Sequence, residues 1–420
     1  MSARAKSMRA NEVSGERGPL TGLRVLDLGR YQAGPRCALM FARMGAEVIK
    51  VEALTGDQSR KNSPRVRGQS AYWVQYNSGK KSLAIDLRTE EGKEILRDLV
   101  KVSDFFLQNF RPGTIARMGF GYEELKRLNA GIIMINVSAY GQYGPSSDRV
   151  GFDPIGQALG GMMMTNGLAG APPARTNFPL IDRITALHGT IGALAALRER
   201  DISGEGQQID VSLADTGFTV NEIPISAYLG DGQEFTREGN GAGLTNSYQT
   251  QNGWAFIAAT NRAMFERLCA ALERPEWVDD ARFTSRQDRR ENADVLEAEL
   301  SAWFARKTTE GAVDHLSAHS VPCAPINDVA AAANDPHIAE REAMVEVPDP
   351  VAGTMWVTGK MIKFSRTPMQ VGSAPVVGEH TDEILTGLLG YDAERVAALI
   401  AAKAVASPPD GAMASGPESS

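Results

Sequence analysis

Short apolar runs and segments with a helical repeat of apolar positions alternate along the first third of the chain. Four runs rich in β-branched and aromatic residues predict buried strands: LRVLDLG (23–29), EVIKVE (47–52), DFFLQNF (104–110) and GIIMINVSAY (131–140). Residues 33–45 predict a helix, because Pro35 suits a helix start and Gly45 a helix end. Strands that alternate with helices predict an α/β domain built on a parallel sheet.

Residues 90–101 show the helical pattern most clearly. Thr89 can cap this helix, and the glutamates that follow it suit the positive end of the helix dipole. Ile95, Leu96, Leu99 and Val100 then form one apolar stripe. The segment therefore predicts an amphipathic helix.

The pattern changes near residue 222, where we place the start of a smaller domain. The Gly-rich segment EGNGAG (238–243) precedes the strand-like GWAFIAA (253–259) and a charged helical stretch at 286–307. Strand-like MWVTGKMIKFS (355–365) and helix-like HTDEILTGLLG (380–390) are expected to rejoin the first domain. The expected division is a large domain of residues 19–221 and 329–403, a small domain of residues 222–328, and disordered ends at 1–18 and 404–420.

Composition and charge narrow the class of protein. The chain has 420 residues, 43% of them hydrophobic, and a formal net charge of −7, which predicts a globular protein of two or three domains. The chain has no Lys/Arg-rich block of the kind that predicts a nucleic-acid interface. It also shows no signal peptide and no apolar run long enough to cross a membrane. Three scattered cysteines fit neither a disulfide framework nor a metal site. We expect a soluble, cytoplasmic protein without a metal, nucleic-acid or membrane partner.

Several charged residues follow the predicted strands. The turn GRYQAGP (29–35) offers a helix N-terminus to an anion, although it is neither a G-x-G-x-x-G motif nor a P-loop. Glu52 ends a strand where dinucleotide folds carry a ribose-binding acid, so a nicotinamide-dependent dehydrogenase stays open as an alternative. Four cations beside other turns are either solvated or converge on a phosphorylated ligand: Lys80, Lys81, Arg111 and Arg117.

Asp182 is open to two interpretations. It precedes the small-residue helix TALHGTIGALAAL (185–197), where an aspartate commonly serves as the helix N-cap. The functional alternative is a carboxylate held in a partly apolar cleft, from which it can attack an acyl carbon.

In their order and spacing, the motifs of this chain resemble the family III CoA-transferases, the group of formyl-CoA transferase and carnitine CoA-transferase. The resemblance runs from about residue 19 to residue 400. It is carried by L-R-V-L-D-L-G-R-Y-Q-A-G-P, G-A-E-V-I-K-V-E, N-S-G-K-K-S-L-A-I-D-L, N-F-R-P-G, the segment from Asp182 through A-L-A-A-L, G-Q-Q-I-D-V-S-L, E-G-N-G-A-G, V-P-C-A-P-I-N-D-V and G-E-H-T-D-E-I-L.

The resemblance implies a fold, an assembly and a reaction. The fold is a Rossmann-like large domain built from both chain ends plus a smaller α+β domain, and the assembly is an interlocked homodimer. The family's catalytic aspartate corresponds to Asp182, which would form a mixed anhydride and then an aspartyl-CoA thioester. Coenzyme A would be a substrate rather than a prosthetic group. The expected donor is succinyl-CoA, and the acceptor is a carboxylic acid that the sequence does not identify.

The resemblance also assigns binding residues. Gln32 and Ala33 match residues that line the CoA site near the reacting thioester, and Tyr140 matches a position beside the active site. Other matches hold CoA (Asn109, Phe110, Arg111 and Arg117), form its nucleotide-end loop (Lys80) or belong to the glycine loop over the aspartyl intermediates (Gly239, Gly241 and Gly243). Two departures are Ala53, where some members carry a basic residue, and a shortened glycine loop, which argues against oxalate as acceptor.

Two further alternatives stay beside the transferase. The α-methylacyl-CoA racemases share the fold but carry a histidine base in a G-H-D-I segment, where this chain has G-F-D-P (151–154). A phenyl ring cannot accept a proton, so Phe152 favours the transferase. A CoA-binding protein without turnover is the other alternative, and the presence of Asp182 with Gln32 argues against it.

Overall fold

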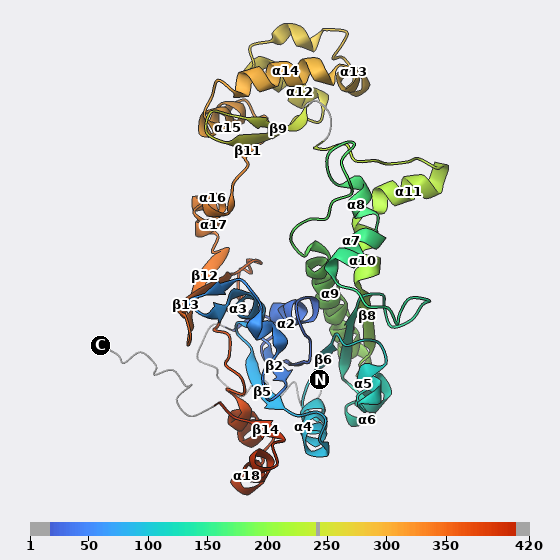
Figure 1. Ribbon diagram of the computed structural model, residues 1–420, viewed down its shortest axis with the longest axis vertical. Helices are drawn as coiled ribbons and strands as arrows, with labels where there is room; N and C mark the ends of the chain where they lie inside the picture. The colour runs from blue at the N-terminus through green and yellow to red at the C-terminus, as the bar shows by residue number, and fades with distance from the viewer. Residues whose placement is uncertain (1–16, 241–243, 409–420) are drawn as a thin grey trace, which may run out of the picture. The chain divides into compact units, whose positions relative to one another are not determined.

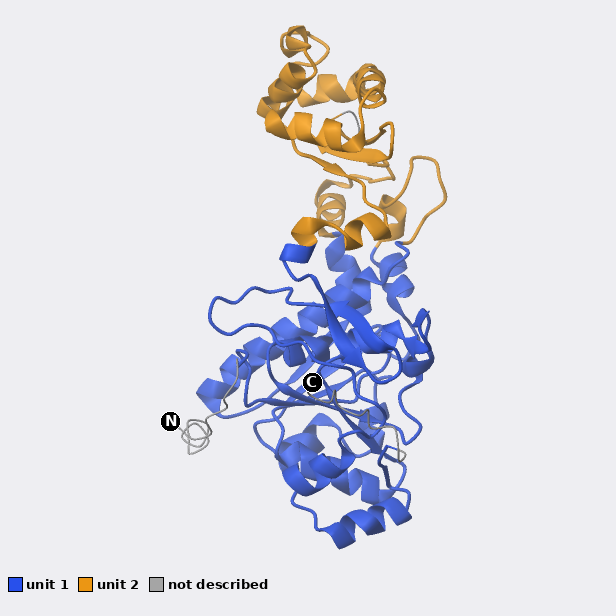
Figure 2. Ribbon diagram, turned by 90° about the vertical axis from the view of Figure 1, so that its left-hand side faces the viewer, with its two compact units in different colours: residues 1–160, 176–221, 339–420 blue, residues 161–175, 222–338 orange. Residues whose placement is uncertain are grey.

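The computed structural model describes residues 17–240 and 244–408 and divides into two compact units (Figure 2). Unit 1 comprises residues 1–160, 176–221 and 339–420, and unit 2 comprises residues 161–175 and 222–338. Two segments that we expected in the large domain, 161–175 and 329–338, therefore belong to the other unit. Segment 161–175 belongs to unit 2 because it is hydrogen-bonded to that unit. The Gly239 N–H donates to the Gly167 carbonyl at 3.0 Å.

Unit 1 is built on a seven-stranded sheet in the order β14-β5-β2-β1-β6-β7-β8 (Figure 1). All neighbours pair in parallel except β14 and β5. The strands are β1 (Arg24–Asp27), β2 (Glu47–Glu52), β5 (Lys81–Ile85), β6 (Phe105–Gln108), β7 (Ile133–Ser138), β8 (Gln208–Ser212) and β14 (Val405–Ala406). The chain reverses direction across the sheet between β1 and β6, and ligands bind at such a switch point in open α/β sheets.

Both faces of this sheet are covered, as the alternation along β6 shows. Phe105 packs on Phe41 of helix α2 (Ala33–Arg43), with ring centroids 4.8 Å apart. Its neighbour Phe106 stacks on Phe120 on the opposite face, at 6.3 Å. The predicted helix over residues 90–101 is confirmed as α4 (Glu90–Lys101), because the Gly92 N–H donates to the Thr89 hydroxyl and the apolar stripe is buried.

Helix α9 (Leu180–Ser203) lies on the first of these faces, packed against α2, β7 and β8. By length and composition alone it could cross a membrane, which is weak evidence, and 39% of its apolar window is buried inside the protein. The remaining elements of unit 1 are η1 (Gln58–Lys61), β3 (Arg65–Val66), β4 (Gln69–Ser70), α3 (Ala71–Asn77), α5 (Thr114–Arg117), α6 (Tyr122–Leu128), α7 (Asp153–Leu159), α10 (Leu213–Val220), β12 (Met344–Asp349), β13 (Gly353–Thr358), the π-helical η3 (Glu383–Leu388) and α18 (Ala393–Ala401).

The C-terminal part corrects two expectations. Residues 355–365 were expected as strands, but β13 ends at Thr358 because its partner β12 begins opposite it, at Met344. The disordered tail was expected from residue 404, yet Val405 and Ala406 form the antiparallel edge strand β14 beside β5. Ala404 and Val405 are buried against the main core, which extends the ordered chain past the expected boundary.

Unit 2 has its own core around a three-stranded antiparallel sheet in the order β11-β10-β9. The charged stretch at 286–307 is two helices rather than one, since the chain breaks helical geometry at Asn292. The elements of unit 2 are α8 (Met162–Thr165), α11 (Glu222–Asp231), β9 (Thr245–Gln249), β10 (Trp254–Ala258), α12 (Arg262–Ala271), η2 (Pro275–Val278), α13 (Arg286–Glu291), α14 (Ala293–Phe304), α15 (Thr309–Ala318), β11 (Cys323–Pro325) and α16 (Val329–Ala333). Helix α17 (Pro336–Glu340) begins in unit 2 and ends in unit 1.

Two buried lysines hold the turn between β1 and α2. The Lys80 ammonium pairs with the Asp27 carboxylate at 2.7 Å and donates to the Pro35 carbonyl at 2.9 Å. Asp27 in turn accepts from the Gly29 N–H at 2.8 Å, and Lys50 donates to the Gly29 carbonyl. Burial lowers the pKa of Lys80 to about 8, against the attraction of Asp27. The turn is therefore fixed from both ends by charges that have no access to solvent.

Replacement of Lys80 should destabilise unit 1 strongly. Lys80→Met leaves the Asp27 carboxylate buried without its cation, which costs about 3–5 kcal/mol and lowers the melting temperature by roughly 10 °C. Differential scanning calorimetry measures the change. Lys81→Met is the matched control, because Lys81 is partly exposed and its ion pairs contribute about 1 kcal/mol or less. Equal melting temperatures for the two variants would contradict the structural role.

Candidate active site

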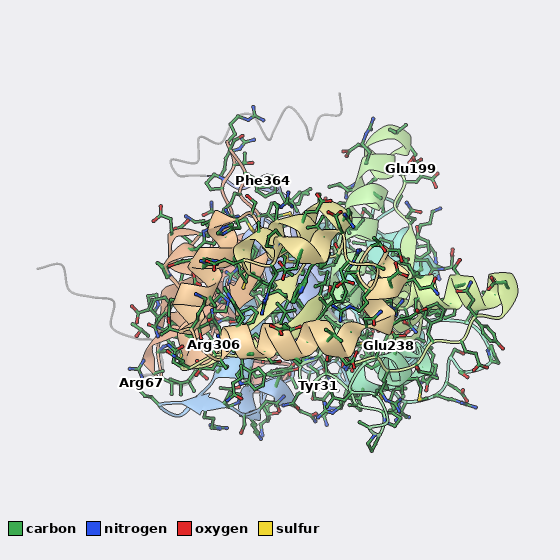
Figure 3. The ribbon with its side chains drawn as sticks, turned by 90° about the horizontal axis from the view of Figure 1, so that it is seen from above. Tyr31, Arg67, Glu199, Glu238, Arg306 and Phe364 are labelled. Atoms are coloured by element: carbon green, nitrogen blue, oxygen red, sulfur yellow. The ribbon has the colours of Figure 1, made fainter. Side chains whose placement is uncertain are left out.

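The turn that follows β1 brings the backbone close to its neighbours. A Cβ on Gly29 would lie 2.8 Å from the Asp27 carboxylate and 3.1 Å from the Gly34 carbonyl carbon, so only glycine fits there. Tyr31, labelled in Figure 3, has a φ of 59°, in the left-handed region. The turn then leads directly into α2 at Ala33. This tightly packed turn places Arg30, Tyr31 and Gln32 at the carboxyl end of β1.

A cavity of about 840 Å³ lies at the ends of β1, β2 and β5. Four cationic side chains line it, Arg30, Arg88, Lys93 and Arg117, and three acids do so as well, Glu52, Asp57 and Asp86. Arg88 is paired with Asp86 at 2.7 Å. The Glu52 carboxylate already accepts from the Asp57 N–H, two nitrogens of Arg60 and the Ser82 hydroxyl, at 2.6–2.9 Å. A carboxylate offers about four acceptor positions. Glu52 is therefore not free to bind a ribose, which removes the sequence argument for a nicotinamide cofactor.

A second cavity, of about 430 Å³, contains Asp182. Most of the residues expected to bind CoA lie in its wall: Gln32, Ala33, Asn109, Phe110 and Arg111. Arg30 and Phe110 line both cavities. The Arg30 backbone and the Asn109 side chain hold each other by two hydrogen bonds, of 2.7 and 2.8 Å. The two cavities thus adjoin at the switch point between β1 and β6.

The expected residues do not all reach these cavities. Arg117 lines the larger cavity only, and Tyr140 is half-buried just beyond Ala139, in the wall of neither. Lys80 was expected to contact CoA, but it is buried in its ion pair with Asp27, lines neither cavity and instead supports the turn of residues 29–35. Gly239 is in unit 2, and Gly241 and Gly243 lie outside the described residues.

Asp182 is the third residue of α9, and the helix N-cap is Pro179. The structural interpretation of Asp182 as the N-cap is therefore wrong. Burial and the negative charge of the neighbouring Asp153 raise the pKa of Asp182 to about 7. In the part of the chain that the structure describes, no lysine or arginine forms an ion pair with Asp182. Its carboxylate is thus a weaker acid and a stronger base than an ordinary aspartate.

Gln32 and Phe152 line the same cavity as Asp182. Gln32 is buried, and its Nε2 has no hydrogen-bond acceptor among the described residues. A buried donor without a partner costs about 1–3 kcal/mol, which indicates a group kept ready for a ligand. Phe152 also lines the cavity, with its ring edge-on to Tyr31 at 6.1 Å. The residue that stands where the racemase motif G-H-D-I has its histidine is therefore a phenyl ring in the wall of this cavity.

Asp153 is a residue of the site that the sequence reasoning did not single out. It begins α7, is almost fully buried, and accepts the Asp182 N–H at 3.0 Å. The sequence signals were its position before Pro154, at a helix start, and the aspartate that G-F-D-P shares with the motif G-H-D-I. Among the described residues, no three histidine, cysteine or acidic side chains gather as a metal site.

Comparison with known proteins identifies the family of the chain. Residues 20–381 match CoA-transferase family III. The chain is 37% identical to succinyl-CoA–D-citramalate CoA-transferase of Chloroflexus aurantiacus, covering 92% of this chain and 98% of that one. It is 36% identical to succinyl-CoA:mesaconate CoA-transferase of Haloarcula marismortui, covering 88% and 96%.

Solved structures give the same result. A CaiB/BaiF family protein from Brucella suis matches with a TM-score of 0.80 and 31% identity, covering 89% of this chain and all of that one. Sequence relatives and structural neighbours therefore agree over most of the chain, and the protein is a CoA-transferase that belongs to family III.

Proposed function

We propose that this enzyme moves CoA from succinyl-CoA to a small dicarboxylic acid through covalent intermediates on Asp182. The observation that carries the proposal is the position of Asp182, a carboxylate of raised pKa inside the cavity that adjoins the cationic one. The choice of substrates follows two relatives, which by name use succinyl-CoA with citramalate or mesaconate.

The two cavities suit the two ends of an acyl-CoA. The phosphates and nucleotide lie in the larger cavity, beside Arg30, Lys93 and Arg117, because guanidinium and ammonium groups bind phosphate oxygens. The pantetheine chain passes Arg30 and Phe110, which line both cavities, and the thioester reaches Asp182. Gln32 and Ala33 flank it there.

The reaction is an exchange of bonds that needs no proton. An Asp182 oxygen attacks the thioester carbon, the C–S bond breaks, and CoA leaves as a thiolate from a mixed anhydride. The thiolate attacks the Asp182 carbonyl carbon, which releases succinate and leaves an aspartyl-CoA thioester. The acceptor carboxylate then attacks this thioester, and the freed thiolate takes the acceptor's acyl group from the new anhydride, which restores Asp182.

Gln32 suits the oxyanion that forms in each of these steps. Its Nε2 is a buried donor without a partner, and donors held ready for a developing negative charge are the largest single contribution in many acyl transfers. The donor needs no reorganisation at the moment of reaction, because the protein has already removed it from water.

We also propose that two copies of this chain associate. Within unit 1, helices α9 and α10 pack together and carry exposed apolar side chains: Leu187 and Ile191, one turn apart on α9, and Phe218 on α10, with 39%, 64% and 51% of their surfaces exposed. Apolar side chains that cluster on one face mark an interaction surface. A second copy of the chain is the expected partner, as the resemblance to the family implies.

Intact-mass measurement with succinyl-CoA tests the proposed chemistry. The wild-type protein should gain the mass of CoA less water, and citramalate or mesaconate should discharge the adduct as the new acyl-CoA. Asp182→Ala should form no adduct, whereas Asp201→Ala, at an exposed aspartate of the same helix, should behave as wild type. An adduct on the Asp182→Ala protein would refute the role of Asp182.

Substitution of Gln32 should slow the chemistry without abolishing binding. Gln32→Ala removes the oxyanion donor, and we expect kcat to fall by about 10²–10³-fold with a much smaller change in KM. Steady-state assays of CoA transfer from succinyl-CoA measure both constants. The control is Gln287→Ala, an exposed glutamine in unit 2. A change confined to KM would show that Gln32 only binds the substrate.

The association of two copies can be measured independently of activity. Light scattering coupled to size-exclusion chromatography should give twice the chain mass for the wild-type protein. Ile191→Lys places a charge among the exposed apolar side chains of α9 and α10 and should shift the protein toward monomer, while Val329→Lys, at an exposed apolar residue of unit 2, should not. A wild-type monomer at micromolar concentration would contradict this assembly.

A further inference from the structure

Asp153 holds the backbone of Asp182 directly. One of its carboxylate oxygens accepts the Asp182 N–H at 3.0 Å, and the other accepts from the Gln157 Nε2 at 2.5 Å. Gln157 is itself fixed, because its Oε1 accepts the Thr176 N–H at 2.9 Å. Asp153 and Gln157 are 4% and 0% exposed, so this bridge between α7 and α9 is shielded from solvent.

Asp153 begins α7, where the helix dipole favours a negative charge, but a full charge is not needed to accept the Asp182 N–H. A neutral Asn or Ser could accept a helix N–H equally well, and burial of a charge without a counter-ion is costly. Among the described residues, Asp153 forms no ion pair with a lysine or arginine. A carboxylate that carries this cost beside a second carboxylate indicates that its negative charge serves the reaction.

Other groups near Asp182 do not supply this charge. Tyr72 and Tyr76 of α3 are neutral at neutral pH, since burial raises the pKa of both phenols. Arg183 follows Asp182 on α9 but, like Arg36 of α2, it acts on Tyr76, whose pKa the two guanidinium groups lower against the effect of burial. The neighbouring charge that acts on Asp182 is that of Asp153.

We propose that Asp153 is a positioning residue for acyl transfer, which fixes the Asp182 backbone and keeps the Asp182 carboxylate basic enough to attack a thioester. The inference rests on the covalent role proposed for Asp182. In that step Asp182 forms the C–O bond and CoA leaves with the electrons of the C–S bond, while Asp153 neither gains nor loses an atom. Since nucleophilicity rises with basicity, as it does for thiolates, the adjacent charge favours the attack.

The pH dependence of adduct formation separates this role from a purely structural one. Only ionised Asp182 attacks, so the wild-type rate should rise with pH and level off above a midpoint near neutrality. Asp153→Asn keeps an acceptor for the Asp182 N–H but removes the charge. The midpoint should then move down by about one pH unit, and the plateau rate should fall several-fold.

Two further variants make the measurement decisive. Glu199→Gln changes an exposed acid on the same helix (Figure 3), about 25 Å farther along, and should leave the midpoint unchanged. In Asp153→Asn the new amide meets the Gln157 amide donor to donor, which can impair folding. The double variant Asp153→Asn/Gln157→Glu exchanges the two groups across this bond, so that folding is restored and the midpoint returns part of the way.

The outcomes distinguish this inference from the function on which it rests. If Asp182→Ala still forms the adduct, the covalent role of Asp182 is wrong, whatever Asp153 does. If Asp182→Ala is inactive but the folded Asp153→Asn protein keeps the wild-type midpoint, the role of Asp153 is overturned. Should the single variant fail to fold, the double variant decides in the same way, because its charge is one side chain farther from Asp182.

Discussion

The buried pair of Lys80 and Asp27 determines the shape of the site. Asp27 ends β1, and Lys80 comes from the segment before β5, so the pair joins two strands of the sheet that are separated by β2. Through the Gly29 N–H and the Pro35 carbonyl it fixes both ends of the turn that carries Arg30 and Gln32. A buried ion pair contributes little net stability, but loss of one partner is costly. The pair is therefore best understood as a device that specifies one geometry for the turn.

Much of the large unit could be predicted from sequence, because its strands and helices are locally consistent. The alternation of Phe105 and Phe106, the cap at Thr89 and the stripe in α4 each reflect short-range rules of periodicity and capping. The errors are long-range. The pairing of Val405 with Ile85 and the bond between Gly167 and Gly239 join residues far apart in the chain. Such contacts leave no periodic signal in their own segments.

The site also contains residues that the sequence motifs identified and residues whose roles depend on their three-dimensional partners. Gln32, Asn109 and Asp182 lie in one cavity, as the motifs implied. Lys80 and Glu52 have the residue types that bind ligands, but their charges are satisfied inside the protein, which only the three-dimensional partners reveal. Asp153 is the opposite case, since its importance comes from a contact with a backbone N–H twenty-nine residues away. Residue type alone cannot separate a charge held for a ligand from one already paired.

The distribution of charge explains how one site can bind an anionic cofactor and still contain a carboxylate nucleophile. Cations along the larger cavity, such as Lys93 and Arg117, would neutralise phosphates, but a cation paired with Asp182 would lower its basicity and weaken it as a nucleophile. The structure separates the two requirements. In the chain as described, Asp182 has no paired cation, and the neighbouring charge that raises its pKa is the carboxylate of Asp153. With a pKa of about 7, the Asp182 carboxylate is more basic than an ordinary carboxylate, which favours its attack on the thioester carbon.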